Sequence, residues 1–232
     1  VGQAGVAGHL GEQPGRARGE LAGLGHQGVA HGQGRRDLPG EQVQGQVPRG
    51  DQRTHPQRLA QGVVDAVAHV VEAGLLVPDG APVASALRRT THLGIGAHQD
   101  DLEFMAFHGI VECFDDPTNG FAGITCTDGG GSARAGRFEA YSDEEMKQVR
   151  AEEQERAAEI GNFRAMWQLG FASSTIKDPG DGRLEDDLSL LFDALRPRVV
   201  YTHNLADKHD THLAVAIAVI RALRSLPVDA RP

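Results

Sequence analysis

The sequence is poor in sulfur and in aromatic residues, and it lacks a long apolar run. Its 232 residues include two cysteines, Cys113 and Cys126, which form neither a CxxC pair nor a dense disulfide framework, so we expect two buried small residues. No apolar stretch approaches the roughly 18 residues that a transmembrane helix needs, and the first residues lack the basic-then-apolar order of a secretory signal. These absences favour a cytoplasmic protein without a membrane span.

Eight residue types are missing from the first 90 residues, namely Lys, Asn, Ile, Phe, Tyr, Trp, Met and Cys. Gly, Gln, Arg, Ala and Val recur there without a fixed period, and such a composition has little with which to build a core. We therefore predict that residues 1–90 are a low-complexity N-terminal extension, either disordered or not native, and that the folded domain spans residues 91–232. Within the extension, only residues 58–76 have the apolar spacing of a helix.

Charge is also distributed unevenly along the chain. Nine arginines nearly cancel eight acidic residues in the extension, so the negative net charge of the chain, −9, arises from residues 91–232. This acidic balance disfavours nucleic acid as a main partner.

Beyond residue 90, segments typical of strands alternate with segments typical of helices. Strands are predicted at residues 91–97, 120–127, 164–171 and 198–203. Helices are predicted at residues 101–111, 143–160, 184–195 and 211–226. The helix after Ser142 is introduced by a capping box, because Glu145 follows three residues later. Strands separated by helices indicate an α/β fold with a Rossmann-like, doubly wound and mainly parallel sheet.

Polar side chains follow two of these strands directly. In open α/β sheets, ligands gather at the carboxyl ends of the strands, so side chains that follow different strands are expected at one edge. The residues concerned are His98, Asp100 and Asp101 after the first strand, and His203, His209 and His212 after the last.

The chemistry of this edge favours a cation over a dinucleotide. Gly94-Ile95-Gly96 begins a GxGxxG pattern, but Gln99 stands in place of the third glycine, and the carboxylates that follow would repel a pyrophosphate. His98 and Asp101 offer a nitrogen and an oxygen, and His212 could complete the set. Three protein ligands with one position open to water are typical of a catalytic zinc site.

The residues that follow these strands resemble those of the LmbE-like or PIG-L-like zinc deacetylases of N-acetylglucosamine compounds. That family has AHPDDxE after its first strand, and this chain has AHQDDLE at residues 97–103. A later HxxH of the family is matched by HDTH at residues 209–212. TDGG, RAEEQERAAEIG and RPRVVYTHN also look like the family's pattern, so the resemblance spans about residues 91–226.

The resemblance implies a zinc-dependent hydrolase that removes the acetyl group from an N-acetylglucosamine-type substrate. It implies that His98, Asp101 and His212 hold Zn²⁺, that Asp100 is the general base, and that His209 stabilises the oxyanion. The two adjacent carboxylates would then have separate roles, one neutralised by the metal and one accepting a proton from water. The implied partner is a small-molecule N-acetyl amino-sugar conjugate, and self-association stays open.

The sequence departs from the family's pattern in three ways. Gln99 replaces the usual proline, which we expect to loosen the loop without removing a ligand. Thr211 stands where the family often has Asp, while Asp210 lies one place earlier. The chain stops at Pro232, whereas family members continue, so we expect the domain to be truncated. A non-catalytic Rossmann-like module that binds a nucleotide or a sugar is the alternative function.

Four further residues have less specific interpretations. His203 could contact the site or its substrate, and Asp128 could contact sugar hydroxyls. His108 is expected to be a packing or surface residue, and Trp167 a core residue.

Overall fold

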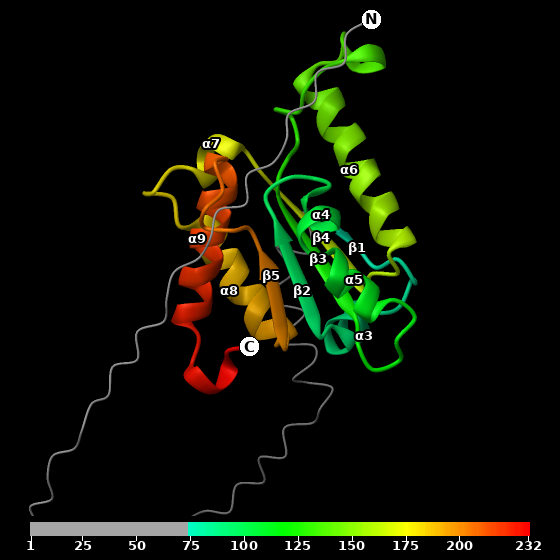
Figure 1. Ribbon diagram of the computed structural model, residues 1–232, viewed down its shortest axis with the longest axis vertical. Helices are drawn as coiled ribbons and strands as arrows, with labels where there is room; N and C mark the ends of the chain where they lie inside the picture. Colours follow the sequence, from blue (N-terminus) through cyan, green and yellow to red (C-terminus); the bar gives the residue numbers. More distant parts are fainter. Residues whose placement is uncertain (1–73) are drawn as a thin grey trace, which may run out of the picture. The chain divides into compact units, whose positions relative to one another are not determined.

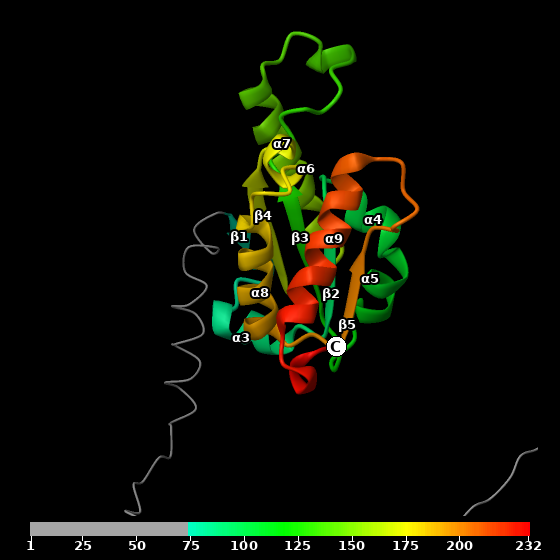
Figure 2. The same cartoon turned by 90° about the vertical axis from the view of Figure 1, so that its left-hand side faces the viewer.

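The computed structural model describes residues 74–232, which form a five-stranded sheet between two layers of helices. The strand order is β1-β4-β3-β2-β5, with β1 antiparallel to β4 and the other neighbours parallel, as Figure 2 shows. The strands are β1 (Leu75–Leu76), β2 (His92–Gly96), β3 (Phe121–Thr127), β4 (Ala165–Phe171) and β5 (Val199–Thr202). The predicted α/β fold with a mainly parallel sheet is confirmed.

Helices cover both faces of this sheet (Figure 1). One face carries α3 (Val83–Arg89), α8 (Arg183–Leu195) and α9 (Asp210–Ser225). The other face carries α4 (Asp101–Met105), α5 (Phe107–Cys113) and α6 (Asp143–Ile160). A short α7 (Ser173–Ile176) and the 3₁₀ turns η1 (Gly136–Phe138) and η2 (Val228–Ala230) complete the described elements. None of the helices in residues 74–232 is both long and apolar enough to cross a membrane.

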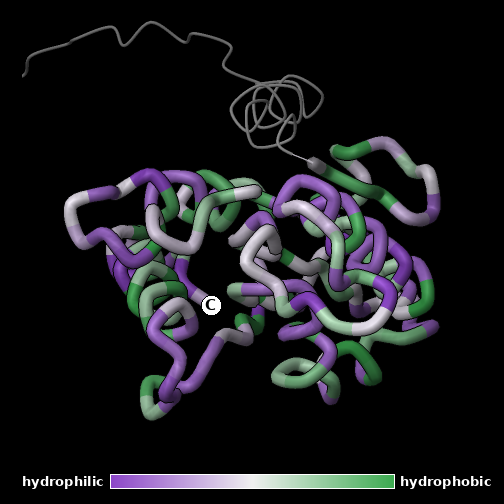
Figure 3. The backbone as a smooth tube through the Cα atoms, turned by 90° about the horizontal axis from the view of Figure 1, so that it is seen from above, coloured by the Kyte–Doolittle hydropathy of each residue, from purple (hydrophilic) through white to green (hydrophobic). Residues whose placement is uncertain are grey.

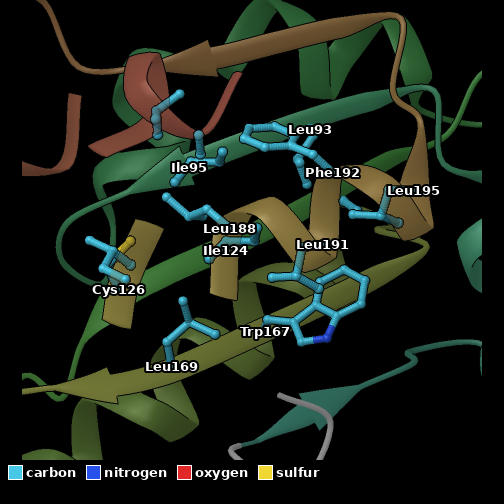
Figure 4. Packing of buried hydrophobic residues seen from close by; sticks show 14 of the residues in the cluster. Leu93, Ile95, Ile124, Cys126, Trp167, Leu169, Leu188, Leu191, Phe192 and Leu195 are labelled. Atoms are coloured by element: carbon cyan, nitrogen blue, oxygen red, sulfur yellow. The ribbon is translucent and has the colours of Figure 1, made fainter. Parts of the chain in front are cut away.

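The larger core lies between the sheet and α8 with α9. Strands buried on both faces carry long apolar side chains, and α8 presents a matching stripe at helical spacing. Figure 4 shows this layer, in which the fully or nearly fully buried residues include Leu93, Ile95, Ile124, Trp167, Leu188, Leu191 and Phe192. Figure 3 shows that hydrophilic and hydrophobic residues alternate along much of the described backbone.

Two glycines allow the other helical layer to approach the sheet closely. A Cβ atom on Gly94 would lie 2.7 Å from the Phe121 ring and 3.0 Å from Leu102, and one on Gly123 would lie 2.6 Å from Leu102. Leu102 is fully buried in the space that the missing side chains leave. Gly94, the first glycine of the incomplete GxGxxG pattern, therefore leaves the space into which Leu102 in the first turn of α4 packs.

The predicted helix at 101–111 is divided in two at Ala106. Its φ of −116° and ψ of 14° lie outside the helical range, so α4 ends at Met105 and α5 begins at Phe107. The break lets Gly109 lie against Tyr201 of β5, where a Cβ atom would come within 2.5 Å of the ring. The predicted bounds of α6 and its capping box are confirmed, because Glu145 N–H donates to Ser142 Oγ and Ser142 N–H donates to Glu145 Oε2.

The packed unit begins before the composition changes at residue 90. Leu75 and Leu76 pair with Trp167 and Met166 of β4, and Leu87 of α3 is buried in the larger core. The end of the helix expected at 58–76 is thus a strand. The prediction for residues 1–73 lies outside the described residues.

Both cysteines are buried and unpaired, as expected. Burial raises the pKa of the Cys113 thiol to about 11 and also raises that of Cys126. Neither thiol is therefore ionised enough to act as a nucleophile near neutral pH.

Two deletions would locate the start of the folded unit. Because β1 pairs with the edge of β4 and α3 packs into the larger core, removing residues 1–85 should lower the free energy of unfolding by about 2–5 kcal/mol. Removing residues 1–71 keeps β1 and, from the composition of that segment, should change it by less than about 1 kcal/mol. Denaturant unfolding of both shortened chains and the full chain is the measurement, and equal stability of the two shortened chains would contradict a structural role for β1.

Candidate metal centre

Two chain segments more than 100 residues apart meet at the carboxyl edge of the sheet. β2 and β5 are parallel neighbours, with Ile95 opposite Thr202, so the segments that follow them leave the sheet side by side. The β2–α4 segment carries the HQDD residues at 98–101, and the β5–α9 segment with the start of α9 carries the histidines at 203, 209 and 212. Both lie at the upper end of the sheet in Figure 1. The expectation that these residues share one edge is confirmed.

His98, Asp101 and His212 bring three potential ligand atoms together. His98 Nδ1 lies 3.2 Å from His212 Nε2 and 3.4 Å from Asp101 Oδ2. His212 Nε2 lies 3.5 Å from Asp101 Oδ1. Donor atoms about 2.0–2.1 Å from a tetrahedral ion lie roughly 3.3–3.4 Å from one another. The two histidine nitrogens therefore have the spacing of ligands to one ion, and each lies near a different oxygen of the Asp101 carboxylate.

The orientation of His212 is set by Asp207. Asp207 Oδ2 lies 2.9 Å from His212 Nδ1, and Oδ1 accepts a hydrogen bond from the His209 backbone N–H at 2.9 Å. Because a carboxylate accepts the proton on Nδ1, the lone pair of His212 is left on Nε2, the atom that faces His98 and Asp101. The His209 backbone and the His212 ring lower the pKa of Asp207 to about 2, so this carboxylate is ionised at neutral pH.

Potential ligand atoms also come together in two other groups, namely His98 with His209 and His212, and Asp101 with His203 and His212. His203 belongs to the second of these groups. Its buried ring stacks on His212 with 4.0 Å between ring centres, and its Nε2 lies 3.3 Å from Asp101 Oδ2. However, the same Nε2 accepts a hydrogen bond from the Ala97 backbone N–H at 2.8 Å. This lone pair is already used, so His203 is better suited to holding the loop after β2 than to binding a metal.

His209 lies at the exposed end of the histidine cluster. Its ring centre is 4.5 Å from that of His212 and 4.9 Å from that of His98. Partial burial, followed by the charges of His212 and His98, lowers the pKa of His209. A neutral imidazole with one N–H is therefore present next to the potential ligands at neutral pH.

Asp101 is the most buried carboxylate of the site. Burial by itself would raise its pKa, but the neighbouring His203 and His98 rings and the His98 backbone N–H outweigh that effect, and the pKa lies below its usual range. The backbone N–H donates to Oδ2 at 2.6 Å. Asp101 is thus an anion held in place among imidazoles, as a ligand for a cation must be.

Asp100 points away from Asp101 toward α6. It has a left-handed backbone conformation with φ of 78°, which Asp tolerates better than most residues. Arg150 Nη2 donates to Asp100 Oδ2 at 2.8 Å, and Asp100 N–H donates to Gln154 Oε1 at 3.0 Å. One turn of α6 therefore holds both the side chain and the backbone of this residue.

Gln99, which replaces the family's proline, ties the loop down rather than loosening it. The side chain is buried, and its Nε2 donates to the Thr127 carbonyl at 3.1 Å. The backbone carbonyl of Gln99 accepts a hydrogen bond from Arg150 Nη2 at 2.7 Å. The expectation of a looser loop is wrong, because these bonds link the segment to both β3 and α6.

A cavity of about 510 Å³ opens over these residues. Ligand pockets in proteins are roughly 300–1,000 Å³. Besides the site residues, its lining includes Gly129, Gly131 and Ser132 after β3, and Lys177 after α7. A small polar molecule could therefore reach the cluster.

Sequence reasoning missed Asp207, Arg150 and Gln154, each of which supports a predicted site residue. The signal for Asp207 was local, since an Asp two residues before a histidine can accept that residue's backbone N–H. Asp210, the carboxylate considered instead, is exposed at the start of α9. Arg150 and Gln154 lie in RAEEQERAAEIG, which resembles the family's pattern, but their partners lie about 50 residues away, so the sequence did not show what they hold.

The residues with less specific interpretations separate into two groups. His108 is exposed and edge-on to Tyr201, and Trp167 is buried in the core, as expected. Asp128 accepts from Gly130 N–H at 3.1 Å and pairs with Lys147 at 3.2 Å, so its oxygens already have partners.

The sequence was compared with profiles of known protein families, and one family matches. The sequence profile of the PIG-L family, described as GlcNAc-PI de-N-acetylase, matches residues 93–223, which is more than half of the chain. The chain belongs to the PIG-L family. The matched segment runs from β2 into α9 and contains every residue of the candidate metal centre.

Three solved structures are similar to this PIG-L chain, and one of them, with a TM-score above 0.5, shares its fold. The N,N'-diacetylchitobiose deacetylase from Pyrococcus horikoshii, complexed with its inhibitor MPG, has a TM-score of 0.51 and 18% identity over 64% of this chain and 54% of its own. The conserved protein TT1542 from Thermus thermophilus has a TM-score of 0.45 and 24% identity over 58% of this chain and 56% of its own. The 4-carboxy-2-hydroxymuconate hydratase GalB from Pseudomonas putida has a TM-score of 0.49 and 20% identity over 58% of this chain and 56% of its own.

The PIG-L chain spans about half the length of these solved structures. No curated protein matches it in sequence.

Two alanine substitutions would distinguish a proposed metal ligand from a residue that holds the loop after β2. If His212 is one of three zinc ligands, as the sequence predicts, His212→Ala should lower bound zinc from about one equivalent to a small fraction. His203→Ala should keep zinc but lower the free energy of unfolding by about 1–3 kcal/mol, because the Ala97 N–H loses its acceptor. Elemental analysis after dialysis and denaturant unfolding are the measurements. Loss of zinc from the folded His203 variant alone would favour the ligand group that contains His203.

Asp207→Asn would test the orientation of His212. An amide does not stabilise the proton on Nδ1 as a carboxylate does, and loss of such outer partners typically lowers metal affinity by about 10–100-fold. Zinc affinity measured by competition with a chelator should show this decrease. Asp210→Asn is the control and should keep the parent affinity, and equal affinities of the two variants would argue against the role given to Asp207.

Proposed function

We propose that this PIG-L chain is the catalytic part of a zinc-dependent hydrolase that removes the acetyl group from an N-acetylglucosamine-type sugar conjugate. The observation that carries this proposal is the convergence of His98 Nδ1, His212 Nε2 and Asp101 within 3.2–3.5 Å of one another beneath an open cavity. Family membership supports the reaction type, and the cavity supports a small substrate.

The donor set fits zinc better than the other common divalent cations. Two imidazole nitrogens and one carboxylate suit zinc, whereas calcium and magnesium prefer oxygen ligands. A set of three protein ligands leaves a position for water or substrate. When bound, zinc would act as a Lewis acid toward the acetyl carbonyl and make a water molecule more acidic.

Asp100 is the residue proposed to take a proton from the attacking water. Its Oδ2 is bound by Arg150, while its Oδ1 has no hydrogen-bond partner within residues 74–232 and can accept the proton. Because Asp100 lies next to Asp101 but is directed toward α6, it can act on water without occupying the ligand position. The same carboxyl group could then return the proton to the leaving nitrogen, so that hydrolysis yields the amine and acetic acid, which ionise to ammonium and acetate near neutral pH.

His209 is proposed to stabilise the negative charge that develops on the carbonyl oxygen. It lies beside His98 and His212 and lines the same cavity. Its lowered pKa leaves it neutral near pH 7, so it would contribute a hydrogen bond from its N–H rather than a full positive charge.

The polar lining suits the substrate's sugar part. Gly129, Gly131, Ser132 and Lys177 line the cavity beside the histidines and offer backbone amides, a hydroxyl and an ammonium group. Sugars present hydroxyl groups that pair with such donors and acceptors. The N-acetyl group would be the part that reaches the histidines, because only there do the proposed metal ligands and base meet.

Asp100→Asn should separate metal binding from catalysis. An amide keeps the shape and cannot accept the proton, so acetate release should fall by roughly 10²–10⁴-fold, the usual contribution of general acid–base catalysis. Zinc content should stay near one equivalent, because Asp100 is not among the proposed ligands. Acetate release from N-acetylglucosamine and its conjugates, measured on the zinc-loaded protein, checks the rate.

Two comparisons complete this experiment. His209→Ala should also keep zinc and lower the rate by about 10²–10³-fold, the loss expected for one oxyanion donor. Zinc-loaded parent chain that binds the sugar without releasing acetate would support the alternative of a non-catalytic sugar-binding module. Near-parent turnover by Asp100→Asn would reject the proposed base.

A further inference from the structure

A second cavity lies at the opposite edge of the sheet, where the strands begin. It has a volume of about 350 Å³. Its lining comes from the end of α3, the residue before β2, the turn before β3 and the residue before β4, at the lower end of the sheet in Figure 1, and consists of Arg88, Arg89, Thr91, Pro117, Thr118, Asn119 and Arg164. Since β2, β3 and β4 are parallel, this edge is the one away from the candidate metal centre.

The cavity is positively charged. Three of its lining residues are arginines and none is acidic. Three guanidinium groups around one cavity repel one another, whether they come from the end of α3 or from the turn before β4. An anion in the cavity would offset that repulsion.

The guanidinium groups are only partly neutralised by the described part of the chain. Arg89 Nη1 pairs with Asp79 at 2.6 Å, but its Nη2 is buried without a hydrogen-bond partner there. Arg164 Nη2 donates to the carbonyls of Asp116 and Asn119 at 3.1 and 3.5 Å, and these acceptors carry no full charge. Arg88 is exposed and forms no ion pair with residues 74–232.

Helix electrostatics explain only part of this arrangement. Positive side chains are favourable at a helix C-terminus, which accounts for Arg88 and Arg89 in the last turn of α3. Arg164 comes from the turn between α6 and β4, so the α3 dipole does not explain its presence. Nor does it explain a buried Nη2 that lacks an acceptor, because such a donor is costly unless something binds it.

We propose that this cavity binds a phosphomonoester carried by a small soluble molecule. Guanidinium groups match the oxygens of a phosphate with paired hydrogen bonds. The volume lies within the range of roughly 300–1,000 Å³ for ligand pockets, so an organic group fits beside the phosphate. Thr118 and Asn119 supply polar atoms for that group, although Thr118 Oγ1 donates to Asp116 and Asn119 Oδ1 accepts from Arg198.

A soluble molecule fits this cavity better than a lipid surface. Membrane binding needs apolar side chains that enter the interface as well as positive charge. Pro117 is the single apolar residue in the described lining. The phosphate is therefore expected on a free small molecule.

Titration with inorganic phosphate tests the site on the whole chain. In ¹H–¹⁵N spectra at constant ionic strength, saturable shifts are expected at the backbone amides of Thr91, Thr118 and Asn119. Arg88→Gln should raise the phosphate Kd by about tenfold or more, since a hydrogen bond to a charged group is lost. Arg88 has no partner in the described fold, so this variant should fold normally.

Three controls make the outcome decisive. Arg221→Gln removes the same charge from α9, outside the cavity, and should leave the Kd within about twofold of the parent value. Arg164→Lys keeps the charge but loses the planar fork, and should weaken binding severalfold. Vesicles of phosphatidylcholine with phosphatidic acid should not bind the chain.

The proposal would be overturned by either of two results. The first is that phosphate produces no saturable shifts around the second cavity at constant ionic strength, or that it binds the Arg88 and Arg221 variants with equal affinity. The second is binding to the vesicles without binding to inorganic phosphate, which would assign the arginines to a lipid surface.

Discussion

The parallel pairing of β2 with β5 is the contact on which the candidate metal centre depends. It places Ile95 opposite Thr202, and Thr202 Oγ1 adds a hydrogen bond to the Ile95 carbonyl at 3.1 Å. The bond from Ala97 N–H to His203 extends the connection beyond the strands. With these links, the loops that carry His98 and His212 leave the sheet as neighbours, although more than 100 residues separate them in the chain.

The burial of the Asp101 carboxylate explains why a cation would be favourable at this site. A carboxylate away from water is costly unless hydrogen bonds and a positive charge compensate it. The His98 backbone N–H supplies one hydrogen bond, and the His203 and His98 rings lower the pKa of this carboxylate. A divalent ion among these side chains would supply the missing charge, so metal binding should also stabilise the fold.

The adjacent aspartates are separated by backbone conformation rather than by distance along the chain. Asp100 is left-handed and is held by Arg150 and Gln154 of α6, while Asp101 begins α4 and is directed toward the histidines. Leu102, seated against Gly94 and Gly123, fixes the first turn of α4 beneath them. Two like charges can therefore stand side by side because each has its own partners on a different side of the loop.

The sequence by itself determined the alternation of strands and helices, the bounds of α6 and the two motifs at the sheet edge, because periodicity, capping and strand-end chemistry are local properties. The halves of the site could be predicted for the same reason. The tertiary structure alone decided that β1 and α3 belong to the packed unit, because the depleted composition of residues 1–90 hides two leucines that pair with β4. It also decided that Asp207 orients His212, that Arg150 and Gln154 hold Asp100, and that three arginines surround a second cavity. These depend on contacts between segments far apart in the chain, which no local pattern records.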